Sequence, residues 1–473
     1  MTFQSFHFFL FLPLITCLAW ILRSRTSAKK SLLLVASYYF YSAWDWRFCG
    51  LLVFLTLLNF WSGRAIARAN DHRIRQAFLI VAIVGSIGVL AFFKYAGFFA
   101  QELMTLLNRM GFLSDGSSLR IVLPLGISFF TFQSLSYVLD IYRRQGEECL
   151  DLRDYALFVA FFPTVLAGPI TRAKDFFPQL RSMANRQSVC EMDEGLALVV
   201  RGFVKKIAFA DVLAVQLVAP AFSDPSAYSS GYLWLALYAY SFQIYMDVSG
   251  YTDIARGTAQ LCGFRLPVNF DRPYWASSVS NFWQRWHMSM SGFFRDYLYF
   301  GLGGTKRGNV YVNLMLTFVA IGVWHGAGWN FLVYGGLHGA IVCWDRWRRK
   351  HQSVSLATQS PPLWAISLLA IALTFHFVVL SRVLFRAADL GSASTYVQRM
   401  VSWEGGLFPV NLLAWAALAG AATLHWVFPR AGGIFVSTMS QVAMPIKVAI
   451  LVAFVYGLIA LSPGSAPFVY FQF

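Results

Sequence analysis

Long apolar segments recur from one end of this sequence to the other, and several approach the roughly 20 residues that a helix needs to cross a bilayer. A soluble domain usually carries about 25% charged residues. This chain of 473 residues carries 13%, and 58% of it is hydrophobic. The apolar segments lie near residues 5–22, 31–45, 49–63, 77–99, 120–141, 155–170, 193–219, 231–255, 308–328, 331–345, 362–385, 407–428 and 440–462. The sequence therefore predicts an all-α polytopic membrane protein.

Some of these segments are too short, or too interrupted by Pro and Gly, to cross cleanly, so we expect about ten to twelve crossings. Residues 123–144 begin with Pro124 and Gly126, and residues 161–180 hold three prolines in an apolar setting. Non-helical backbone at membrane depth is tolerated where it lines a cavity or is buried in protein. We therefore expect re-entrant pieces around a chamber, within a single membrane domain covering residues 1–473.

The basic residues form short clusters between the apolar segments rather than one patch. These clusters are Arg23, Arg25, Lys29 and Lys30; Arg64, Arg68, Arg73 and Arg75; Arg143 and Arg144; Arg172 and Lys174; and Arg346, Arg348, Arg349 and Lys350. No Lys or Arg precedes the first segment, so the excess of positive charge inside places the N-terminus outside, with residues 155–190 re-entrant. The net charge of +16 is thus a topology signal, and we expect no nucleic-acid partner.

The six cysteines are scattered, with no CxxC pair and no paired spacing. We therefore expect neither a disulfide framework nor a metal site. The N-terminal segment lacks a basic start and a small-residue cleavage site, so we expect it to be retained as a first span.

The longest stretch predicted not to span the membrane is 256–307, where Pro267 and Pro273 exclude a continuous helix at the start. Asn281 and Gln284 resemble a capping pair, which predicts a helix over 281–300. At about 100° per residue, one arc of this helix is aromatic and apolar: Phe282, Trp283, Trp286, Met290, Phe293, Phe294 and Tyr297. Such a helix, with cations opposite its aromatic face, is expected to lie in the membrane interface, here on the cytoplasmic side.

Two histidines stand out because of where they fall. His287 lies at the boundary of the aromatic arc, and His325 ends the apolar run Val310–Val323. An ionisable group at membrane depth is costly unless it faces a cavity or a partner. Neutral imidazole is the usual general base or nucleophile near neutral pH, so both are candidate catalytic groups.

The glycines near His325 allow a blander interpretation. Gly322 with Gly326, and Gly335 with Gly339, form small-xxx-small patterns that let helix backbones approach closely. Helix packing alone explains these patterns as well as a shaped site does. The histidines at 338, 376 and 425 are interpreted as packing residues.

Several polar residues are candidates to orient a histidine or hold a polar substrate. Asp247 lies near the inner end of a predicted span with Gln243 one turn before it, and Asp296 follows Arg295 in the interfacial segment. Pairing with Arg256, Arg285 or Arg295 is the alternative for the carboxylates, and for all but Asp247 it is the interpretation we favour. The chain has no GxSxG, Walker, HExxH or His-x4-Asp motif, which disfavours the corresponding hydrolase, ATPase, metalloprotease and glycerolipid-acyltransferase classes.

Two blocks, "NFWQRWHMSMSGFFRDYLYFGLGG" and "GVWHGAGWNFLVYGGLHG", strongly resemble the membrane-bound O-acyltransferases, and within them the bacterial alginate O-acetylation branch. The blocks "LPLGISFFTFQSLSYVLDIYR", "FFPTVLAGPI", "MDVSGYTDIARG" and "VLFRAADL" match the same branch in the same order. The resemblance covers about residues 30–390.

The resemblance implies a fold around a transmembrane tunnel, in a multi-pass protein of the bacterial inner membrane. It places the near-invariant family histidine at His325 and the second at His287. It implies no bound cofactor, acetyl-CoA as cytoplasmic donor, and a periplasmic acetyltransferase partner that esterifies polysaccharide, besides contact with membrane lipid. Residues expected to line the tunnel or contact substrate are Asp247, Gln243, Trp324, Arg285 and Asp296.

Three alternatives stay open at this point. A sister enzyme of the family transfers D-alanine to teichoic acid. A proton-coupled transporter could use His287, His325 and Asp247 as a relay, although no inverted repeat supports it. An inert scaffold for a polysaccharide synthase would have no need for two costly imidazoles. Between alginate, cellulose and another exopolysaccharide as acceptor, the sequence does not choose.

Overall fold

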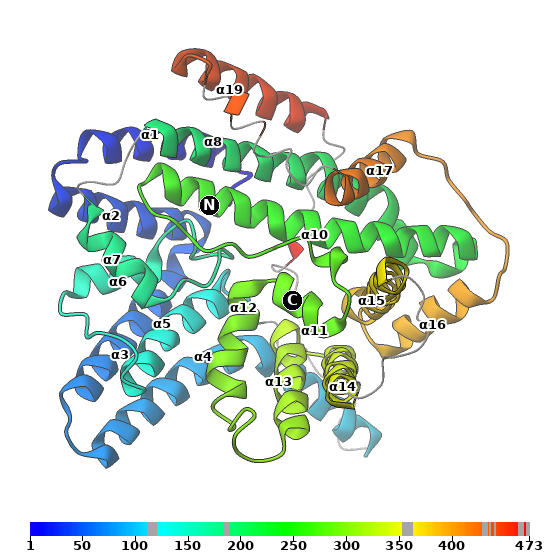
Figure 1. Cartoon of the computed structure of the whole chain (residues 1–473), viewed down its shortest axis with the longest axis horizontal. Helices are drawn as coiled ribbons and strands as arrows, with labels where there is room; N and C mark the ends of the chain where they lie inside the picture. The colour runs from blue at the N-terminus through cyan, green and yellow to red at the C-terminus, as the bar shows by residue number, and fades with distance from the viewer. Residues whose placement is uncertain are drawn as a thin grey trace. The chain divides into compact units, whose positions relative to one another are not determined.

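The structure, a computed structural model, describes residues 1–110, 121–183, 189–351, 363–427, 434, 437–438, 441–461 and 468–469. Throughout these residues the regular elements are helices, and Tyr228 and Leu407 form an isolated bridge (Figure 1). This confirms the predicted all-α fold.

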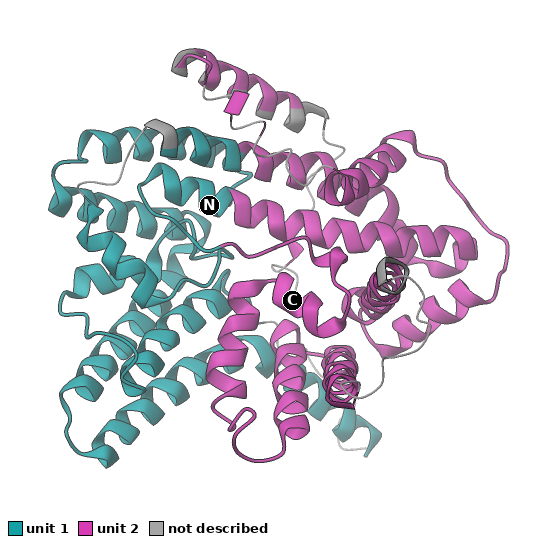
Figure 2. Ribbon diagram, in the orientation of Figure 1, with its two compact units in different colours: residues 1–199, 254–267 teal, residues 200–253, 268–473 magenta. Residues whose placement is uncertain are grey.

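The chain divides into two compact units (Figure 2). Unit 1 contains Met1–Val199 and Ile254–Pro267, and unit 2 contains Val200–Asp253 and Val268–Phe473. The predicted interfacial segment, 256–307, is therefore divided, and both candidate histidines belong to unit 2.

Unit 1 is a helical bundle with polar contacts inside it. Its helices are α1 (Phe6–Ile21), α2 (Thr26–Asp45), the short η1 (Trp46–Phe48), α3 (Cys49–Arg68), α4 (His72–Arg109), α5 (Ile127–Tyr142), α6 (Leu152–Ala160), α7 (Ala173–Arg181) and most of α8 (Val189–Phe203). The Asn59 amide on α3 donates to Ser86 Oγ on α4 at 3.0 Å and to Ser134 Oγ on α5 at 3.4 Å. These buried hydrogen bonds join three helices inside the unit, in addition to the Arg75 guanidinium on α4, which donates to Ile66 O on α3 and Tyr142 O on α5, each at 2.8 Å.

The two Pro- and Gly-containing segments of unit 1 each include non-helical backbone, as expected, residues 123–126 before α5 and the buried residues 161–171 before α7. Gly126 adopts a left-handed conformation (φ 75°) directly before α5. A Cβ at this position would lie 2.1 Å from the carbonyl oxygen of Val165 in the second segment. The Gln133 side chain on α5 donates to Phe158 O and accepts from the Thr171 amide at 3.4 Å. Side-chain amides thus satisfy backbone groups that no helix can pair.

Unit 2 begins with π-helical turns and contains the long helix α10. Its elements are η3 (Val204–Asp211), η4 (Ala214–Val218), α9 (Ala219–Ser223), η5 (Pro225–Ala227), α10 (Ser230–Leu261, to Asp253 in this unit), η6 (Pro273–Trp275), α11 (Val279–Arg285), α12 (Met288–Phe293), η7 (Phe294–Tyr299), α13 (Val310–His325), α14 (Trp329–His351), α15 (Leu363–Arg386), α16 (Leu390–Val401), α17 (Leu412–Trp426) and α19 (Met444–Leu461).

Helices α13 and α14 form a tight hairpin (Figure 1). A Cβ on Gly322 would lie 2.3 Å from Phe331 O and 2.9 Å from the Cα of Gly335. The small-residue patterns therefore serve helix packing, and that packing fixes the end of α13 at His325.

The continuous helix expected over 281–300 is wrong. Helix α11 begins at Val279, where Ser278 Oγ rather than Asn281 caps it by accepting from the Asn281 amide at 3.1 Å. His287 is left-handed (φ 44°) and separates α11 from α12, and η7 is a π-helix. The aromatic arc residues are all buried inside unit 2 rather than facing lipid. The place of the segment at the cytoplasmic membrane interface stays a prediction.

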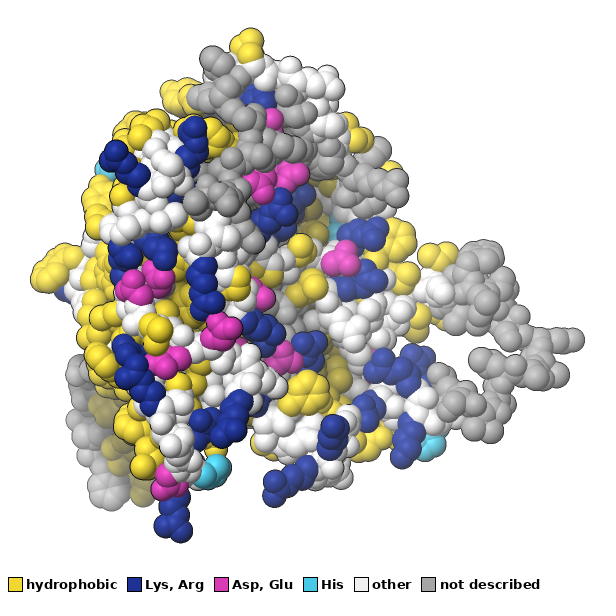
Figure 3. All heavy atoms as spheres, turned by 60° about the vertical axis from the view of Figure 1, so that its left-hand side comes forward, with side chains coloured by type: hydrophobic (Ala, Val, Ile, Leu, Met, Phe, Trp, Pro, Cys, Tyr) yellow, Lys and Arg dark blue, Asp and Glu magenta, His cyan; other side chains and the backbone are white. Residues whose placement is uncertain are grey.

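Within the part of the chain that the structure describes, three helical stretches are long and apolar enough to cross a membrane: Thr26–Arg68, His72–Arg109 and Ser367–Arg386. Three shorter helices, α1, α13 and α17, are also apolar. Helix α4 shows the character of a lipid-facing span, because Ile80, Val84 and Phe92 are at least half exposed. Figure 3 shows Lys and Arg side chains spread among Asp and Glu over the face turned forward. The total of ten to twelve crossings stays a prediction.

Replacing Gly126 with Ala is expected to destabilise unit 1. The left-handed conformation alone costs an L-residue about 1–2 kcal/mol, and the clash with Val165 O adds to it. The measurement is thermal stability of the detergent-purified protein. Gly88→Ala on α4 is the matched control, because a Cβ there meets nothing within 4 Å. Equal melting temperatures for Gly126→Ala and wild type would contradict the description of this turn.

Candidate functional site

The structure brings the two candidate histidines together around one tryptophan. His325 is the last residue of α13 and His287 precedes α12, and each side chain is almost completely buried, at 2% and 1% exposure. The Trp324 ring centroid lies 4.7 Å from that of His325 and 6.0 Å from that of His287. Trp324 was expected to line a tunnel, and here its ring contacts both imidazoles.

A short backbone network holds His287 in its left-handed conformation. The carbonyl of Asn269 accepts from the Met288 amide at 2.9 Å, and Asn269 Oδ1 accepts from the Ser289 amide at 2.9 Å. The His287 carbonyl accepts from the Ser291 amide at 2.9 Å and so starts the next helix. A left-handed non-glycine residue is uncommon and persists only where its surroundings fix it. Asn269 therefore determines where the His287 side chain is presented.

Burial decides the protonation state of His287. Loss of hydration lowers the pKa of this imidazole to about 3. His287 is consequently neutral near pH 7, and a neutral imidazole offers one hydrogen-bond donor and one acceptor. Such a group can accept a proton, hold a hydroxyl or attack a carbonyl, but it carries no imidazolium proton to donate.

Aromatic side chains enclose the pair on its other sides. The Phe385 ring on α15 lies 4.9 Å from the His325 ring, and the Tyr334 ring on α14 lies 6.1 Å from it. The Phe270 ring lies 6.0 Å from the His287 ring. Phe385 belongs to the block "VLFRAADL", so the family resemblance was a signal that could have singled it out.

Asp247 lies in a buried ionic network on α10. Its Oδ1 is 2.8 Å from Lys206 Nζ, and the same ammonium is 2.8 Å from Asp211 Oδ1 on η3. Its Oδ2 accepts from the backbone amide of Val469 at 2.8 Å. Lys206, Asp211 and Val469 were not singled out from the sequence. Lys206, a charge inside an apolar segment, was a readable signal, whereas the Val469 contact joins residues too distant for any sequence pattern to pair.

The other polar candidates are not drawn into the histidine cluster by any contact described. Gln243 is buried one turn before Asp247, and its Oε1 has no hydrogen-bond partner among the described residues. Arg285 Nε donates to Asn281 Oδ1 at 3.1 Å. Asp296 pairs with its neighbour Arg295 at 2.7 Å, which is the pairing weighed as the alternative.

A further histidine forms a structural hydrogen-bond chain. Trp283 Nε1 donates to His338 Nδ1 at 3.2 Å, and His338 Nε2 lies 3.0 Å from Ser381 Oγ. Because the Ser381 hydroxyl donates to Val378 O at 2.8 Å, it accepts from Nε2–H. His338 is thus a neutral residue whose two nitrogens are both engaged in packing α14 against its neighbours.

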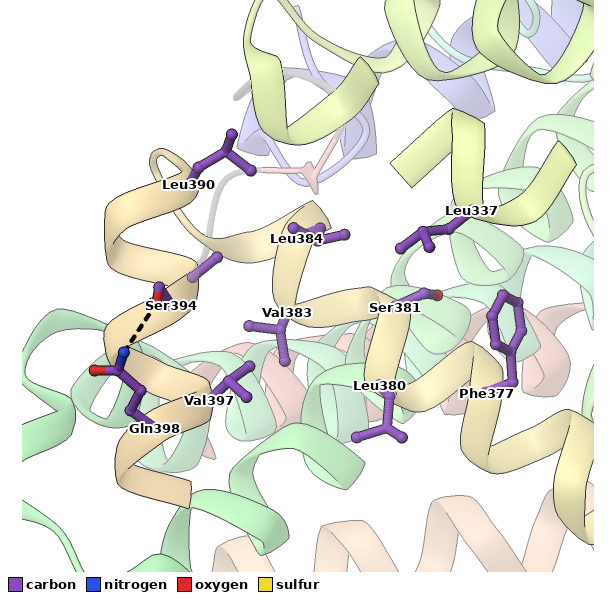
Figure 4. Close-up of a pocket in the computed structure, with 11 residues that line it drawn as sticks. Leu337, Phe377, Leu380, Ser381, Val383, Leu384, Leu390, Ser394, Val397 and Gln398 are labelled. Atoms are coloured by element: carbon purple, nitrogen blue, oxygen red, sulfur yellow. Dashed lines mark hydrogen bonds between the residues drawn. The ribbon is translucent and has the colours of Figure 1, made fainter. Parts of the chain in front are cut away.

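The protein has a cavity of about 450 Å³ between α14, α15 and α16 (Figure 4). Its lining is apolar apart from Ser381, Ser394 and Gln398, and none of the predicted site residues belongs to it. Among the residues with described side chains, no group of three or more His, Cys, Asp or Glu is placed to hold a metal ion.

Comparison of the sequence with known proteins identifies the family of the region that contains these histidines. Residues 143–383, which include both histidines, match the membrane-bound O-acyltransferase family. The chain is 35% identical, over the whole of both proteins, to the probable alginate O-acetylase AlgI of Pseudomonas putida.

Two further relatives carry different names. The peptidoglycan O-acetyltransferase of Helicobacter pylori is 33% identical over 80% of this chain and 74% of its own length. The teichoic acid D-alanyltransferase of Streptococcus thermophilus is 30% identical over 55% of this chain and 68% of its own length. The chain therefore belongs to the membrane-bound O-acyltransferase family, in its alginate O-acetylase-like branch, and is a multi-pass membrane acyltransferase.

Proposed function

We propose that this protein takes an acetyl group from cytoplasmic acetyl-CoA and passes it across the bacterial inner membrane for O-acetylation of an exopolysaccharide. The observation that carries the proposal is the cluster of His287, Trp324 and His325, buried within the family-matched region. Acetyl is favoured over D-alanine because the alginate O-acetylase similarity spans the whole chain, whereas the D-alanyltransferase similarity spans 55% of it.

His325 acts as general base or as transient acyl carrier. As a base, its imidazole nitrogen takes the proton of the acceptor hydroxyl while the hydroxyl oxygen attacks the thioester carbonyl. The C–S bond then breaks, the ester forms, and the CoA thiolate takes a proton. As a carrier, the imidazole nitrogen attacks the carbonyl and releases the thiol, and the hydroxyl later takes the acetyl group from the acyl-imidazole.

His287 serves by positioning the donor rather than by protonating it. Burial keeps its pKa far below the working pH, so an imidazolium at this place is too rare to act as general acid. The neutral ring can still orient a thioester or hydroxyl through one hydrogen bond. We further propose that a periplasmic acetyltransferase partner receives the acetyl group and esterifies the polymer, with alginate or cellulose as the class of acceptor.

The polar residues predicted to line the tunnel or contact substrate have different roles in this proposal. Gln243 offers a buried acceptor that a polar substrate can use. Arg285 and Asp296 are held in local pairs at the surface of the same segment and are proposed to stabilise it rather than bind substrate. Asp247 shares Lys206 with Asp211, which favours a role in joining α10 to η3.

Substitution of either histidine is expected to remove acetate from the exopolysaccharide. His325→Ala takes away the base or carrier and should lower ester-linked acetate by about 100-fold or more, the range of general-base contributions. His287→Ala should lower it by a smaller factor, because positioning remains partly possible. The measurement is base-released acetate per polymer mass at matched membrane abundance of each variant.

An exposed histidine outside the site supplies the control for this experiment. His376 is exposed on α15, where its Nδ1 is 2.7 Å from the carbonyl of Ala372 in the same helix. His376→Ala should leave the acetate content unchanged, and polymer yield should be normal in all three variants. Wild-type acetate content in His325→Ala would contradict the proposed role of His325 as base or acyl carrier.

Removing the charge of Lys206 is expected to damage the fold. Lys206→Met leaves two buried carboxylates facing each other, and breaking a buried pair costs on the order of 3–5 kcal/mol. The expected result is a sharp loss of folded protein in membranes, measured by detergent extraction and thermal stability. Lys306→Met, at an exposed lysine, is the control. A fully stable Lys206→Met protein would argue against the structural role and return Asp247 to the substrate candidates.

A further inference from the structure

Helix α15 carries two arginines one turn apart near its end, and the two stack on different rings. Arg382 is 1% exposed, and its guanidinium carbon lies 4.5 Å from the centroid of the Trp286 ring and 5.5 Å from that of Phe385. The Arg386 guanidinium lies 5.6 Å from the centroid of the Phe222 ring. Arg382 is thus buried against two aromatic side chains, and Arg386 is a natural comparison on the same helix.

Each aromatic residue beside Arg382 is close to one histidine of the site, Trp286 in the sequence and Phe385 in space. Trp286 directly precedes His287 in the chain. The Phe385 ring lies 4.9 Å from the His325 ring. One guanidinium therefore contacts both the residue that carries the His287 backbone into its left-handed turn and the ring that packs on His325.

Trp324 is a further contact shared by the two histidines. Its ring centroid lies 6.0 Å from that of His287 and 4.7 Å from that of His325. Trp324 therefore joins the two histidines directly, and Arg382 joins Phe385, which packs on His325, to Trp286, which is bonded to His287 in the chain. Arg382 thus contacts aromatic residues beside each histidine, in addition to the direct ring contacts of Trp324, Phe270 and Tyr334 with the imidazoles.

Filling space does not require an arginine here. A buried guanidinium carries a large loss of hydration, which a Met or Leu of similar length would avoid. What an arginine offers instead is a planar cation that stacks on aromatic faces, which the compact, strongly hydrated ammonium of lysine does less well. The position lies in an apolar run, where a charged residue marks function by default.

We propose that Arg382 is a positioning residue of the acyl-transfer site. Its planar guanidinium clamps Trp286 and Phe385, and through them it holds His287 and His325 in their reactive arrangement. The inference rests on the proposed acetyl transfer, and it assigns this arginine a role in the geometry of the reaction rather than in donor binding.

The test measures kinetics with radiolabelled acetyl-CoA in inverted membrane vesicles, following base-labile acetate, at matched abundance of each variant. Arg382→Met should lower kcat by about 10- to 100-fold, the loss that a displacement of about 1 Å can cause, with KM for acetyl-CoA almost unchanged. Arg382→Lys should not recover the rate, because it keeps the charge but loses the planar stack. Arg386→Met should keep the wild-type kcat.

A double-mutant cycle tests whether Arg382 acts through its aromatic contact, and it includes a variant that keeps the arginine. Phe385→Leu alone should lower kcat, and its combination with Arg382→Met should cost clearly less than the product of the two single effects, because residues in contact do not act additively. Thermal stability of each variant is measured alongside, since a loss of fold would lower abundance rather than kcat per folded molecule.

The outcomes separate this inference from the function on which it rests. A wild-type kcat in Arg382→Met, recovery of the rate by Arg382→Lys, a change confined to KM, or multiplicative effects in the cycle would each overturn the positioning role. His325→Ala in the same vesicles reports on acetyl transfer itself: full activity there would overturn the proposed function, whereas its loss beside a fully active Arg382→Met would overturn only the inference about Arg382.

Discussion

The candidate site depends on the contacts of the Trp324 ring with the rings of both His287 and His325. His325 is the last residue of α13, and the close approach of Gly322 to α14 fixes the position of that helix. His287 lies in a left-handed backbone turn, which a regular helix does not contain. Both side chains are buried, and burial lowers the pKa of His287 so that its imidazole is neutral near pH 7.

A second constraint is the buried ionic network between α10 and η3. Lys206 serves two carboxylates at once, and the backbone amide of Val469 completes the partners of Asp247. Buried charges are stable only when their partners are held in place. The network therefore couples the long helix of unit 2 to the π-helical turn before it and to a segment near the end of the chain.

Local patterns in the sequence predicted the helical class, the irregular segments around Gly126 and the candidate role of His325, because each follows from apolar runs, prolines or a misplaced imidazole. The helix over 281–300 was wrong because a period of 3.6 residues cannot register a left-handed residue held by Asn269 from outside the helix. The hydrogen bond between Val469 and Asp247 could not be predicted from local patterns either, because it joins distant parts of the chain. Lys206 and Arg382 are charged residues inside apolar segments, so the sequence could have indicated them as candidates, but neither was predicted.

The central claim is that His325 takes part in transfer of the acetyl group. The decisive measurement is transfer of label from acetyl-CoA to base-labile ester in inverted membrane vesicles, with His325→Gln compared with wild type at equal abundance and equal thermal stability. The account predicts a loss of about 100-fold or more in the His325→Gln vesicles, since the amide neither accepts a proton nor attacks a carbonyl. Transfer at the wild-type rate would contradict it and would reduce His325 to a packing residue of the α13–α14 hairpin.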